Sequence, residues 1–336
     1  MTSNKLNRRL VLASRPAGIP DPSHFARDDQ PVPSLAEGEF LVRNLYLSID
    51  PAQRGWVNAA ANYSAPVAIG AVMRALTVGV VESSRCAQVA VGQHLYGWFG
   101  WQDYCAATAA SILMRVDLRT GPLSTAVGLY GINGTTAYLA LTEIGRPKAG
   151  ETVLVSTAAG ALGSLVGQIA RRLGCHVVGL TGDDQKVTSC TKEFGYHAAL
   201  NYRHGQQCEK LRELCPRGVD IFFDNTSGEI ADAVWPLLNV RARIIQCGTA
   251  AIACWDPMPT GPRHERDILM KRMHHEGFVI FDHVERYTKV VEQLAAWVRE
   301  GSLVYHEDIE EGLDRAPAAL AAIYRGENRG KKVIKL

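Results

Sequence analysis

Residues 152–182 constrain the fold of this 336-residue chain most, because they follow the pattern strand, turn, helix, strand. Residues 152–156 are apolar and rich in β-branched side chains, which is typical of a strand buried on both faces. The next segment carries apolar residues at helical spacing: Leu165, Val166, Ile169, Ala170 and Leu173. Gly174 ends the predicted helix, and residues 176–180 form the second strand. Such a unit binds a dinucleotide pyrophosphate where its helix begins.

The first turn of this unit has the sequence Ala-Ala-Gly-Ala-Leu-Gly over residues 158–163. Gly160 allows the backbone to come close to a phosphate, and Gly163 allows close contact between helix and strand. Two glycines also occur in ordinary turns between a strand and a helix, so a plain turn is the alternative interpretation. The strand before and the helix and strand after favour the phosphate site. We therefore expect these cofactor contacts: Ala159, Gly160, Ala161, Leu162 and Gly163.

The end of the second strand discriminates between NAD and NADP. An NAD site carries Asp or Glu there, whereas this chain has Thr181 and Gly182, followed by Lys186. A cation near the ribose 2′ oxygen favours a 2′-phosphate, and Tyr202 after the third strand is a second candidate contact. The alternatives are a solvated charge for Lys186 and a half-buried aromatic for Tyr202, and two aspartates before Lys186 weaken the positive field. The pattern predicts NADP(H).

The chain changes character near residue 125. Up to that point, short apolar runs separated by Gly and Pro are typical of a small β-rich domain. Helices and strands then alternate, which indicates a doubly wound Rossmann-like parallel sheet. We therefore predict an α/β protein with a β-rich substrate domain (residues 1–125 together with 302–336) and a dinucleotide-binding domain (residues 126–301). Within the latter we expect a short helix over 267–275, a strand over 278–281 and a long helix over 284–300.

The bulk composition excludes several classes of partner. Lys and Arg number 36 and Asp and Glu 34, a formal net charge of +2, which gives no argument for nucleic acid or an anionic membrane. No segment approaches the roughly 20 consecutive apolar residues of a membrane span. Only a short apolar run follows Arg8 and Arg9, too short for a secretory signal. We therefore expect a cytoplasmic protein.

The cysteines and histidines do not predict a metal site. The eight cysteines contain no Cys-x-x-Cys pair, and the ten histidines are scattered along the chain. A catalytic zinc ion needs three protein ligands that converge. We therefore expect reduced thiols and no metal.

Several runs together carry a resemblance to a known family. They are VRNLYLSIDP at 42–51, GWQDY at 100–104, EIGRPKAGET at 143–152, the turn at 158–163, Asp224-Asn225, and GENRGK at 326–331. The chain resembles the medium-chain dehydrogenase/reductase superfamily, in the zinc-independent branch of leukotriene B4 dehydrogenase/prostaglandin reductase, curcumin reductase and plant alkenal double-bond reductases. The resemblance runs nearly end to end and implies a GroES-like fold for the β-rich domain.

This resemblance implies a reaction and further cofactor contacts. The implied reaction is NADPH-dependent reduction of the C=C bond of an α,β-unsaturated ketone or aldehyde, with hydride transfer to the β carbon and protonation at the α carbon. A homodimer is also implied. Lys186 and Tyr202 are placed on the 2′-phosphate. The additional cofactor residues implied by the family pattern are Asn225, Cys247, Phe278, Val279, Ile280 and Asn328.

The chain departs from the family pattern in the substrate site. The family often has one tyrosine directly after Asp-Pro and another after the Cys-Gly strand end, where this chain has Ala52 and Ala253. Tyr63, in a loop that resembles the family's active-site loop, is then the candidate catalytic donor, with loop packing as the alternative; a ribose hydroxyl or water is another proton source. Arg54 either contacts substrate or forms a structural ion pair. The expected wide, apolar pocket includes Ala52, Arg54, Ala253 and Trp255.

Two other functions remain compatible with these residues. One is an NADP-dependent carbonyl/alcohol or quinone oxidoreductase, which an assay with an enone against its saturated ketone would separate. The other is a cofactor-binding protein without turnover, for which the two missing tyrosines are the argument. NADPH binding without oxidation across a substrate panel would favour that function.

Overall fold

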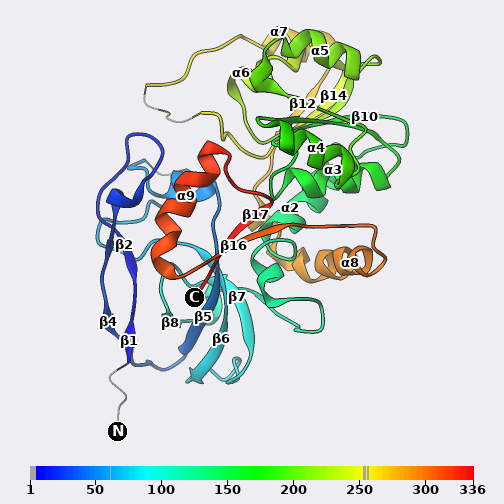
Figure 1. The fold of residues 1–336 in the computed structure, drawn as a ribbon. Helices are drawn as coiled ribbons and strands as arrows, with labels where there is room; N and C mark the ends of the chain where they lie inside the picture. The colour runs from blue at the N-terminus through cyan, green and yellow to red at the C-terminus, as the bar shows by residue number, and fades with distance from the viewer. Residues whose placement is uncertain (1–4, 61, 253–254, 256) are drawn as a thin grey trace. The chain divides into compact units, whose positions relative to one another are not determined.

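The computed structural model describes residues 5–60, 62–252, 255 and 257–336 (Figure 1). Internal contacts divide the chain into two compact units. Unit 1 comprises Met1–Gly131 and Glu307–Leu336, and unit 2 comprises Ile132–His306. The last segment of the chain therefore belongs to the same unit as the first.

Unit 2 is built on a six-stranded parallel sheet in the order β12-β11-β10-β13-β14-β15. Its strands are β10 (Thr152–Ser156), β11 (His176–Thr181), β12 (Ala198–Asn201), β13 (Val219–Asp224), β14 (Leu238–Gln246) and β15 (His274–Gly277). From β10 the chain moves outward to β12 and then returns to β13 on the other side of β10. The carboxyl ends of β10 and β13 therefore flank a topological switch point, where doubly wound sheets bind ligands.

Helices connect these strands. They are α2 (Ile132–Ala140), α3 (Gly163–Arg172), α4 (Asp184–Lys192), α5 (Gln207–Leu214), α6 (Gly228–Asp232), α7 (Glu265–Lys271) and α8 (Tyr287–Arg299). Helix α3 packs on β10 and β11, and α2 packs against both α3 and α8. A buried cluster that includes Leu154, Phe222 and Ile244 forms a core beneath the sheet. The apolar strands predicted from the sequence are thus buried.

Unit 1 contains a seven-stranded sheet in the order β16-β17-β5-β6-β7-β9, with β8 also paired to β5. Its strands are β5 (Phe40–Ser48), β6 (Leu76–Ser84), β7 (His94–Trp98), β8 (Tyr104–Ala107), β9 (Ile112–Arg115), β16 (Glu307–Glu311) and β17 (Lys331–Lys335). Two small ladders join β1 (Leu6–Asn7) to β4 (Gln30–Pro31) and β2 (Leu10–Leu12) to β3 (Phe25–Arg27). Helices α1 (Ala52–Trp56) and α9 (Ala316–Arg325) complete the unit.

The C-terminal strand fixes the loop after β5. Strand β17 pairs antiparallel with β5, with Val333 opposite Ser48. Helix α9, drawn in red in Figure 1, precedes this strand and ends at Gly326, whose φ of 75° caps the helix. The Asp-Pro segment that begins α1 therefore lies beside residues from the far end of the chain.

The predicted fold class is confirmed, whereas near residue 270 one predicted element is wrong and two predicted helices have different bounds. The helix expected over 267–275 ends at Lys271, and its last part is β15. The strand expected over 278–281 is absent, because Ile280–Arg286 is a 3-10 helix, and the long helix begins only at Tyr287. Strand β15 consists of four exposed residues and pairs with β14. Sheet pairing, rather than an apolar pattern, makes it a strand.

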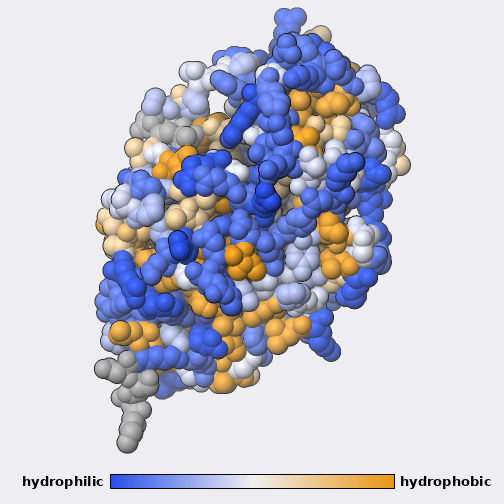
Figure 2. Space-filling view, viewed as in Figure 1, coloured by the Kyte–Doolittle hydropathy of each residue, from blue (hydrophilic) through white to orange (hydrophobic). Residues whose placement is uncertain are grey.

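The helices in the part of the chain that the structure describes can be compared with the length and hydropathy of a membrane span. None of the described helices is long and apolar enough to cross a bilayer. On the face shown in Figure 2, apolar residues lie in small groups separated by hydrophilic ones.

Candidate functional site

The turn after β10 requires glycine where helix α3 begins. A Cβ atom on Gly163 would lie 2.4 Å from the carbonyl oxygen of Thr157 and 2.8 Å from the Cα of Ala158. Thr157 has a φ of 51°, which a β-branched residue rarely adopts outside functional sites. The turn holds the ten-residue helix α3 against the end of β10. The N–H groups of Ser164 and Leu165 donate to the carbonyl oxygens of Gly160 (3.0 Å) and Leu162 (3.1 Å) in the turn itself, and the positive end of the α3 dipole favours an anion at this place.

Tyr196 fastens this turn and was not predicted from the sequence. Its hydroxyl donates to the carbonyl oxygen of Gly163 at 2.6 Å, and lies 3.3 Å from that of Ala158. Gly167 in α3 and Gly179 in β11 make room for the ring, because a Cβ on either would lie within 3.1 Å of it. In the sequence, only the glycine in the helix and the glycine in the following strand hint that a large side chain packs between these two elements.

At the end of β11, Gly182 lies directly against Tyr202. A Cβ on Gly182 would lie 2.6 Å from the Tyr202 hydroxyl oxygen and 3.3 Å from Nε of Arg203. The cause is the parallel register, which pairs Thr181 with Asn201. A phenol and a guanidinium therefore occupy the place where an NAD-binding unit carries its acidic residue. Arg203 was missed because nothing in the local pattern distinguishes it from a solvated charge.

Lys186 lies half-buried in the first turn of α4. The two aspartates that precede it have local partners. The Asp183 carboxylate accepts a hydrogen bond from the backbone N–H of Lys186 at 3.0 Å and so caps the helix. The Asp184 carboxylate accepts from Asn201 at 2.7 Å and lies 3.3 Å from Nε2 of His204. These partners occupy the carboxylates that the sequence placed beside Lys186.

The Asp224 carboxylate joins the carboxyl ends of β10, β13 and β14. It is 2% exposed. Its oxygens accept from the hydroxyl groups of Ser156 (3.1 Å) and Thr226 (2.9 Å), from the backbone N–H groups of Thr226 (2.8 Å) and Ser227 (3.0 Å), and from the Gln246 side chain (3.2 Å). Ser227 has a φ of 56°, a second strained residue at this edge of the sheet. Asp224 belongs to the Asp224-Asn225 run that resembles the family, but we predicted no role for it from the sequence.

Asn225 and Cys247 lie at the same edge. The Asn225 side-chain amide donates to the carbonyl oxygen of Ser156 at 2.9 Å. The backbone N–H of Cys247 donates to the carbonyl oxygen of Asp224 at 2.8 Å. Burial raises the pKa of the Cys247 thiol to about 12, so it stays protonated. The structure therefore places Asn225 against the end of β10, just before the turn, and Cys247 against the end of β13.

Phe278, Val279 and Ile280 continue from β15. The backbone N–H of Phe278 donates to the carbonyl oxygen of Gln246 at 3.0 Å, and its ring stacks on His283 at 4.9 Å. Of the remaining predicted cofactor residues, Asn328 lies in unit 1, where its amide donates to the carbonyl oxygen of Gly330 at 2.8 Å.

Three of the predicted substrate residues lie in unit 1. Ala52 and Arg54 are on α1, and Arg54 is 6% exposed, with Nε donating to the carbonyl oxygen of Gly18 at 3.1 Å. Tyr63 lies in the following loop and is 53% exposed. Trp255 lies in unit 2 and is 47% exposed. Ala253 lies outside the described residues.

A buried ion pair anchors the loop that precedes α1. The Lys331 ammonium lies 2.6 Å from Oδ1 of Asp50 and donates to the carbonyl oxygen of Ile49 at 2.7 Å. The two side chains are only 5% and 4% exposed. Ser48 also hydrogen-bonds to the Asp50 carboxylate. The Asp-Pro segment is thus fixed by charge as well as by the β5–β17 ladder.

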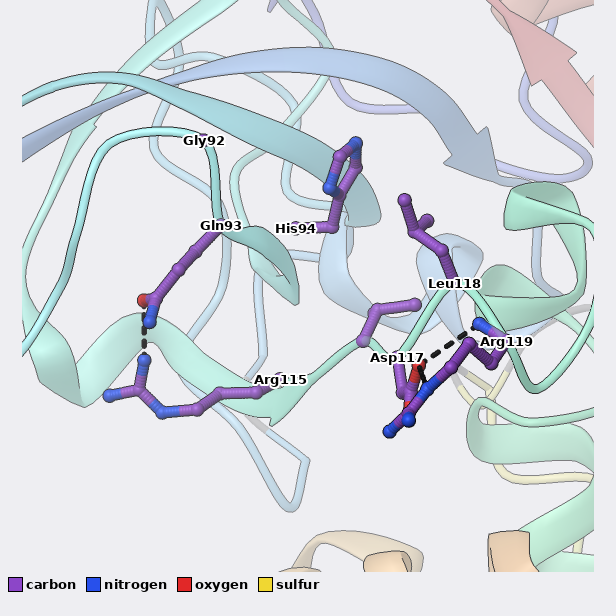
Figure 3. Close-up of a pocket in the computed structure, with 8 residues that line it drawn as sticks. Gly92, Gln93, His94, Arg115, Asp117, Leu118 and Arg119 are labelled. Carbon is purple, nitrogen blue, oxygen red and sulfur yellow. Dashed lines mark hydrogen bonds and ion pairs between the residues drawn. The ribbon is translucent and has the colours of Figure 1, made fainter.

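A separate pocket, shown in Figure 3, lies within unit 1 between the start of β7 and the segment after β9. Its two arginines are already paired. Arg115 donates to the Gln93 side chain at 2.6 Å, and Arg119 forms an ion pair with Asp117 at 2.6 Å. Burial lowers the pKa of His94. In this pocket Asp117 compensates the charge of Arg119, whereas the contacts given for Arg115 are to neutral oxygens of Gln93 and Gln88.

Within the described ranges, no group of three or more His, Cys, Asp or Glu side chains is arranged to hold a metal ion. The cysteines that the structure describes there are free thiols.

Comparisons with known proteins agree with this architecture. Residues 8–116 match a family described as the N-terminal domain of oxidoreductase, and residues 161–296 match one described as zinc-binding dehydrogenase. The chain is 38% identical over 335 residues to the NADPH-dependent curcumin reductase of Escherichia coli. This alignment covers 98% of this chain and 97% of the relative. It is 34% identical to the NADP(+)-dependent 2-alkenal reductase of Nicotiana tabacum, over 99% and 98% of the two chains.

A solved structure shares the fold over almost the same length. CurA from Vibrio vulnificus in complex with NADPH superposes with a TM-score of 0.90 at 37% identity, covering 98% of both chains. Relatives above 30% identity that align over nearly the whole chain establish common descent. The chain therefore belongs to the medium-chain dehydrogenase/reductase superfamily, in the zinc-independent branch that includes curcumin reductase and 2-alkenal reductase.

Proposed function

We propose that this chain is an NADPH-dependent reductase of the C=C bond of α,β-unsaturated ketones and aldehydes. The observation that carries this proposal is the end-to-end similarity to an NADPH-dependent curcumin reductase and an alkenal reductase. Two features of unit 2 support it. The glycine-bearing turn offers a phosphate site, and the end of β11 carries the Tyr202 phenol against Gly182 in place of an acidic residue. NADPH, when bound, supplies the hydride.

The residues of the carboxyl edge fit this cofactor. A Cβ at Gly163 would clash with the backbone of Thr157 and Ala158, so glycine at this position lets α3 begin directly against the end of β10, as in a dinucleotide-binding turn. We assign the pyrophosphate to Ala159, Gly160, Ala161, Leu162 and Gly163. We assign the 2′-phosphate to Lys186 and Tyr202, beside Thr181 and Gly182, and add Arg203 to them. We assign the nicotinamide end to Asn225, Cys247, Phe278, Val279, Ile280 and Asn328.

On the substrate side, we assign the donor role to Tyr63. Negative charge develops on the carbonyl oxygen once the β carbon is reduced, and a hydrogen-bond donor aimed at that oxygen lowers the barrier. A phenol suits this role because it stays protonated at neutral pH. The other pocket residues in this assignment are Ala52, Arg54, Ala253 and Trp255. Residues 1–125 with 302–336 would then bind the substrate, and residues 126–301 the cofactor.

A steady-state assay tests the reaction. The purified chain is mixed with NADPH and either 3-nonen-2-one or its saturated ketone, 2-nonanone, and the products are identified by gas chromatography. We expect NADPH oxidation with the enone alone and 2-nonanone as the product. Reduction of 2-nonanone to the alcohol would contradict the proposal and favour a carbonyl reductase. Binding of NADPH without turnover of any enone would favour the cofactor-binding protein.

The cofactor assignment makes a prediction for Lys186. Replacing Lys186 by alanine is expected to raise the KM for NADPH about ten- to a hundredfold, since a hydrogen bond to a charged group contributes roughly 1.5–3 kcal/mol. The KM for NADH, which lacks the 2′-phosphate, should stay within about twofold. Lys192→Ala, at the other end of the same helix, is the matched control. Equal losses with both cofactors would show that Lys186 acts on helix α4 rather than on the phosphate.

We further propose that the chain forms a homodimer through unit 2. Strand β15 lies at the edge of the parallel sheet, and its four residues are exposed. The preceding helix α7 exposes 74% of Leu269 and 58% of Met270. An unpaired strand edge beside apolar side chains is a surface that a second copy can cover. Light scattering should give the mass of two chains, and Leu269→Lys with Met270→Lys should reduce it to one. A single-chain mass for the unmodified protein would contradict this.

A further inference from the structure

Tyr324 lies at the start of α1, although the two are 273 residues apart along the chain. Its hydroxyl donates to the carbonyl oxygen of Pro51 at 2.6 Å. Pro51 directly precedes Ala52, the first residue of α1, so the phenol is anchored to the residue that begins this helix. Tyr324 occupies the last turn of α9 and is half-buried.

The ring of Tyr324 lies among the other candidate substrate residues of unit 1. The Arg54 guanidinium lies 5.9 Å from the centre of the ring, within the range of a cation–π contact. Burial raises the pKa of the Tyr324 phenol. Arg54 lowers this pKa and Tyr63 raises it, so both groups are close enough to interact with Tyr324. The phenol is therefore protonated and can act as a hydrogen-bond donor at every physiological pH.

The frame around Tyr324 is rigid. Pro51 precedes α1 and is held by the buried pair of Asp50 and Lys331 on one side. Gly326 ends α9 two residues after Tyr324. The Tyr324–Pro51 hydrogen bond therefore joins two segments that are each held by further contacts. Ala52, the first residue of α1, carries only a methyl group.

We propose that Tyr324 is a positioning and specificity-determining residue of the substrate site. Its ring forms the wall beside Ala52 and Arg54, and its hydroxyl holds the Pro51 carbonyl in place. The ring near the start of α1 is thus supplied from α9 and not from position 52. The proposal rests on the proposed function, in that α1 and the Tyr63 loop are taken to line the substrate site.

An exchange of side chains tests this assignment. We expect Tyr324→Leu to raise the KM for 3-nonen-2-one about tenfold, while kcat and the KM for NADPH stay within about twofold. Ala52→Tyr should also impair the enzyme, because two rings compete for one place. The double variant, Ala52→Tyr with Tyr324→Leu, should recover to within about threefold of the unmodified enzyme, since it puts one ring back at the start of α1. Single-variant losses that simply multiply in the double variant would overturn the proposal.

Further variants keep the result interpretable. Tyr324→Phe keeps the ring and removes only the hydroxyl, so it should fold and show part of the KM increase even where the leucine variant does not fold. Tyr46→Leu, a half-buried tyrosine on β5, is the matched control and should leave KM unchanged. If the unmodified chain reduces a quinone but no enone, the proposed function fails, and the same exchange is measured with the quinone. An unchanged KM in both Tyr324 variants would overturn the Tyr324 assignment alone.

Discussion

Replacing Asp50 by alanine is expected to lower the free energy of unfolding by about 3–5 kcal/mol, the usual effect of removing one partner of a buried ion pair. The Lys331 ammonium lies 2.6 Å from the Asp50 carboxylate, and both side chains are at most 5% exposed. Without Asp50 the ammonium keeps only the carbonyl oxygen of Ile49 as a close partner among these contacts. Urea-induced unfolding followed by circular dichroism at pH 7 measures the change.

The deficit should also depend on pH in a defined direction. Burial lowers the pKa of Lys331 and Asp50 opposes this, so removing Asp50 lowers that pKa further. Between the folded pKa and about 10.4, the value in the unfolded chain, the unfolded state then binds more protons than the folded state. Stability therefore rises with pH in this window, and the deficit of the variant should shrink as the pH approaches about 10.

Two further variants separate charge from packing. Lys335 lies on β17, like Lys331, and forms an exposed ion pair with Glu311 on β16. Lys335→Ala should lower the free energy of unfolding by less than about 1 kcal/mol. Asp50→Ala with Lys331→Met removes both buried charges, so it should be less destabilising than the sum of the single changes. An Asp50→Ala variant as stable as Lys335→Ala would show that the buried pair contributes little.

The sequence was sufficient for the fold class because local patterns repeat along it. The β10–α3–β11 unit has apolar strands, a helical apolar face and a glycine at each end of the helix, and each of these signals is local. Strand β15 carries no such signal: its residues are polar and exposed, and only pairing with β14 makes them a strand. The segment Ile280–Arg286 shows the opposite case: its apolar first residues resemble a strand, but it is a 3-10 helix.

The candidate site divides in the same way. The turn at 158–163 and the positions of Lys186 and Tyr202 follow from motifs within one βαβ unit and its neighbour. Tyr196, Arg203 and Asp224 act through contacts between residues 21 to 68 positions apart, which no local pattern reveals. Tyr324 is the extreme case, because its partner lies 273 residues away. The sequence shows that position 52 is not a tyrosine. It does not show that the Tyr324 hydroxyl lies on the preceding residue, Pro51.

Gly163→Ala is expected to weaken NADPH binding about a hundredfold, because a displacement of about 1 Å in a positioned site has effects of that size. The new Cβ would lie 2.4 Å from the Thr157 carbonyl oxygen and 2.8 Å from the Ala158 Cα. Both are backbone atoms, so the strain cannot be relieved by turning a side chain. Helix α3 must instead move away from β10, taking its first N–H groups with it. Titration of NADPH fluorescence gives the dissociation constant.

Two other glycines provide a graded control for this prediction. A Cβ on Gly160, in the same turn, would lie 3.1 Å from the Thr157 carbonyl oxygen, so Gly160→Ala leaves α3 against β10 and acts only through the added methyl group beside the phosphate; its loss of affinity should be smaller than that of Gly163→Ala. A Cβ on Gly261 would meet only the Asp232 carboxylate, at an ordinary 3.6 Å, so Gly261→Ala should leave binding unchanged. The thermal shift that NADPH gives to the unmodified chain should fall in the same order, since it reports affinity by mass action. If Gly163→Ala bound NADPH as tightly as Gly261→Ala, the close approach of α3 to β10 would not be what forms the phosphate site.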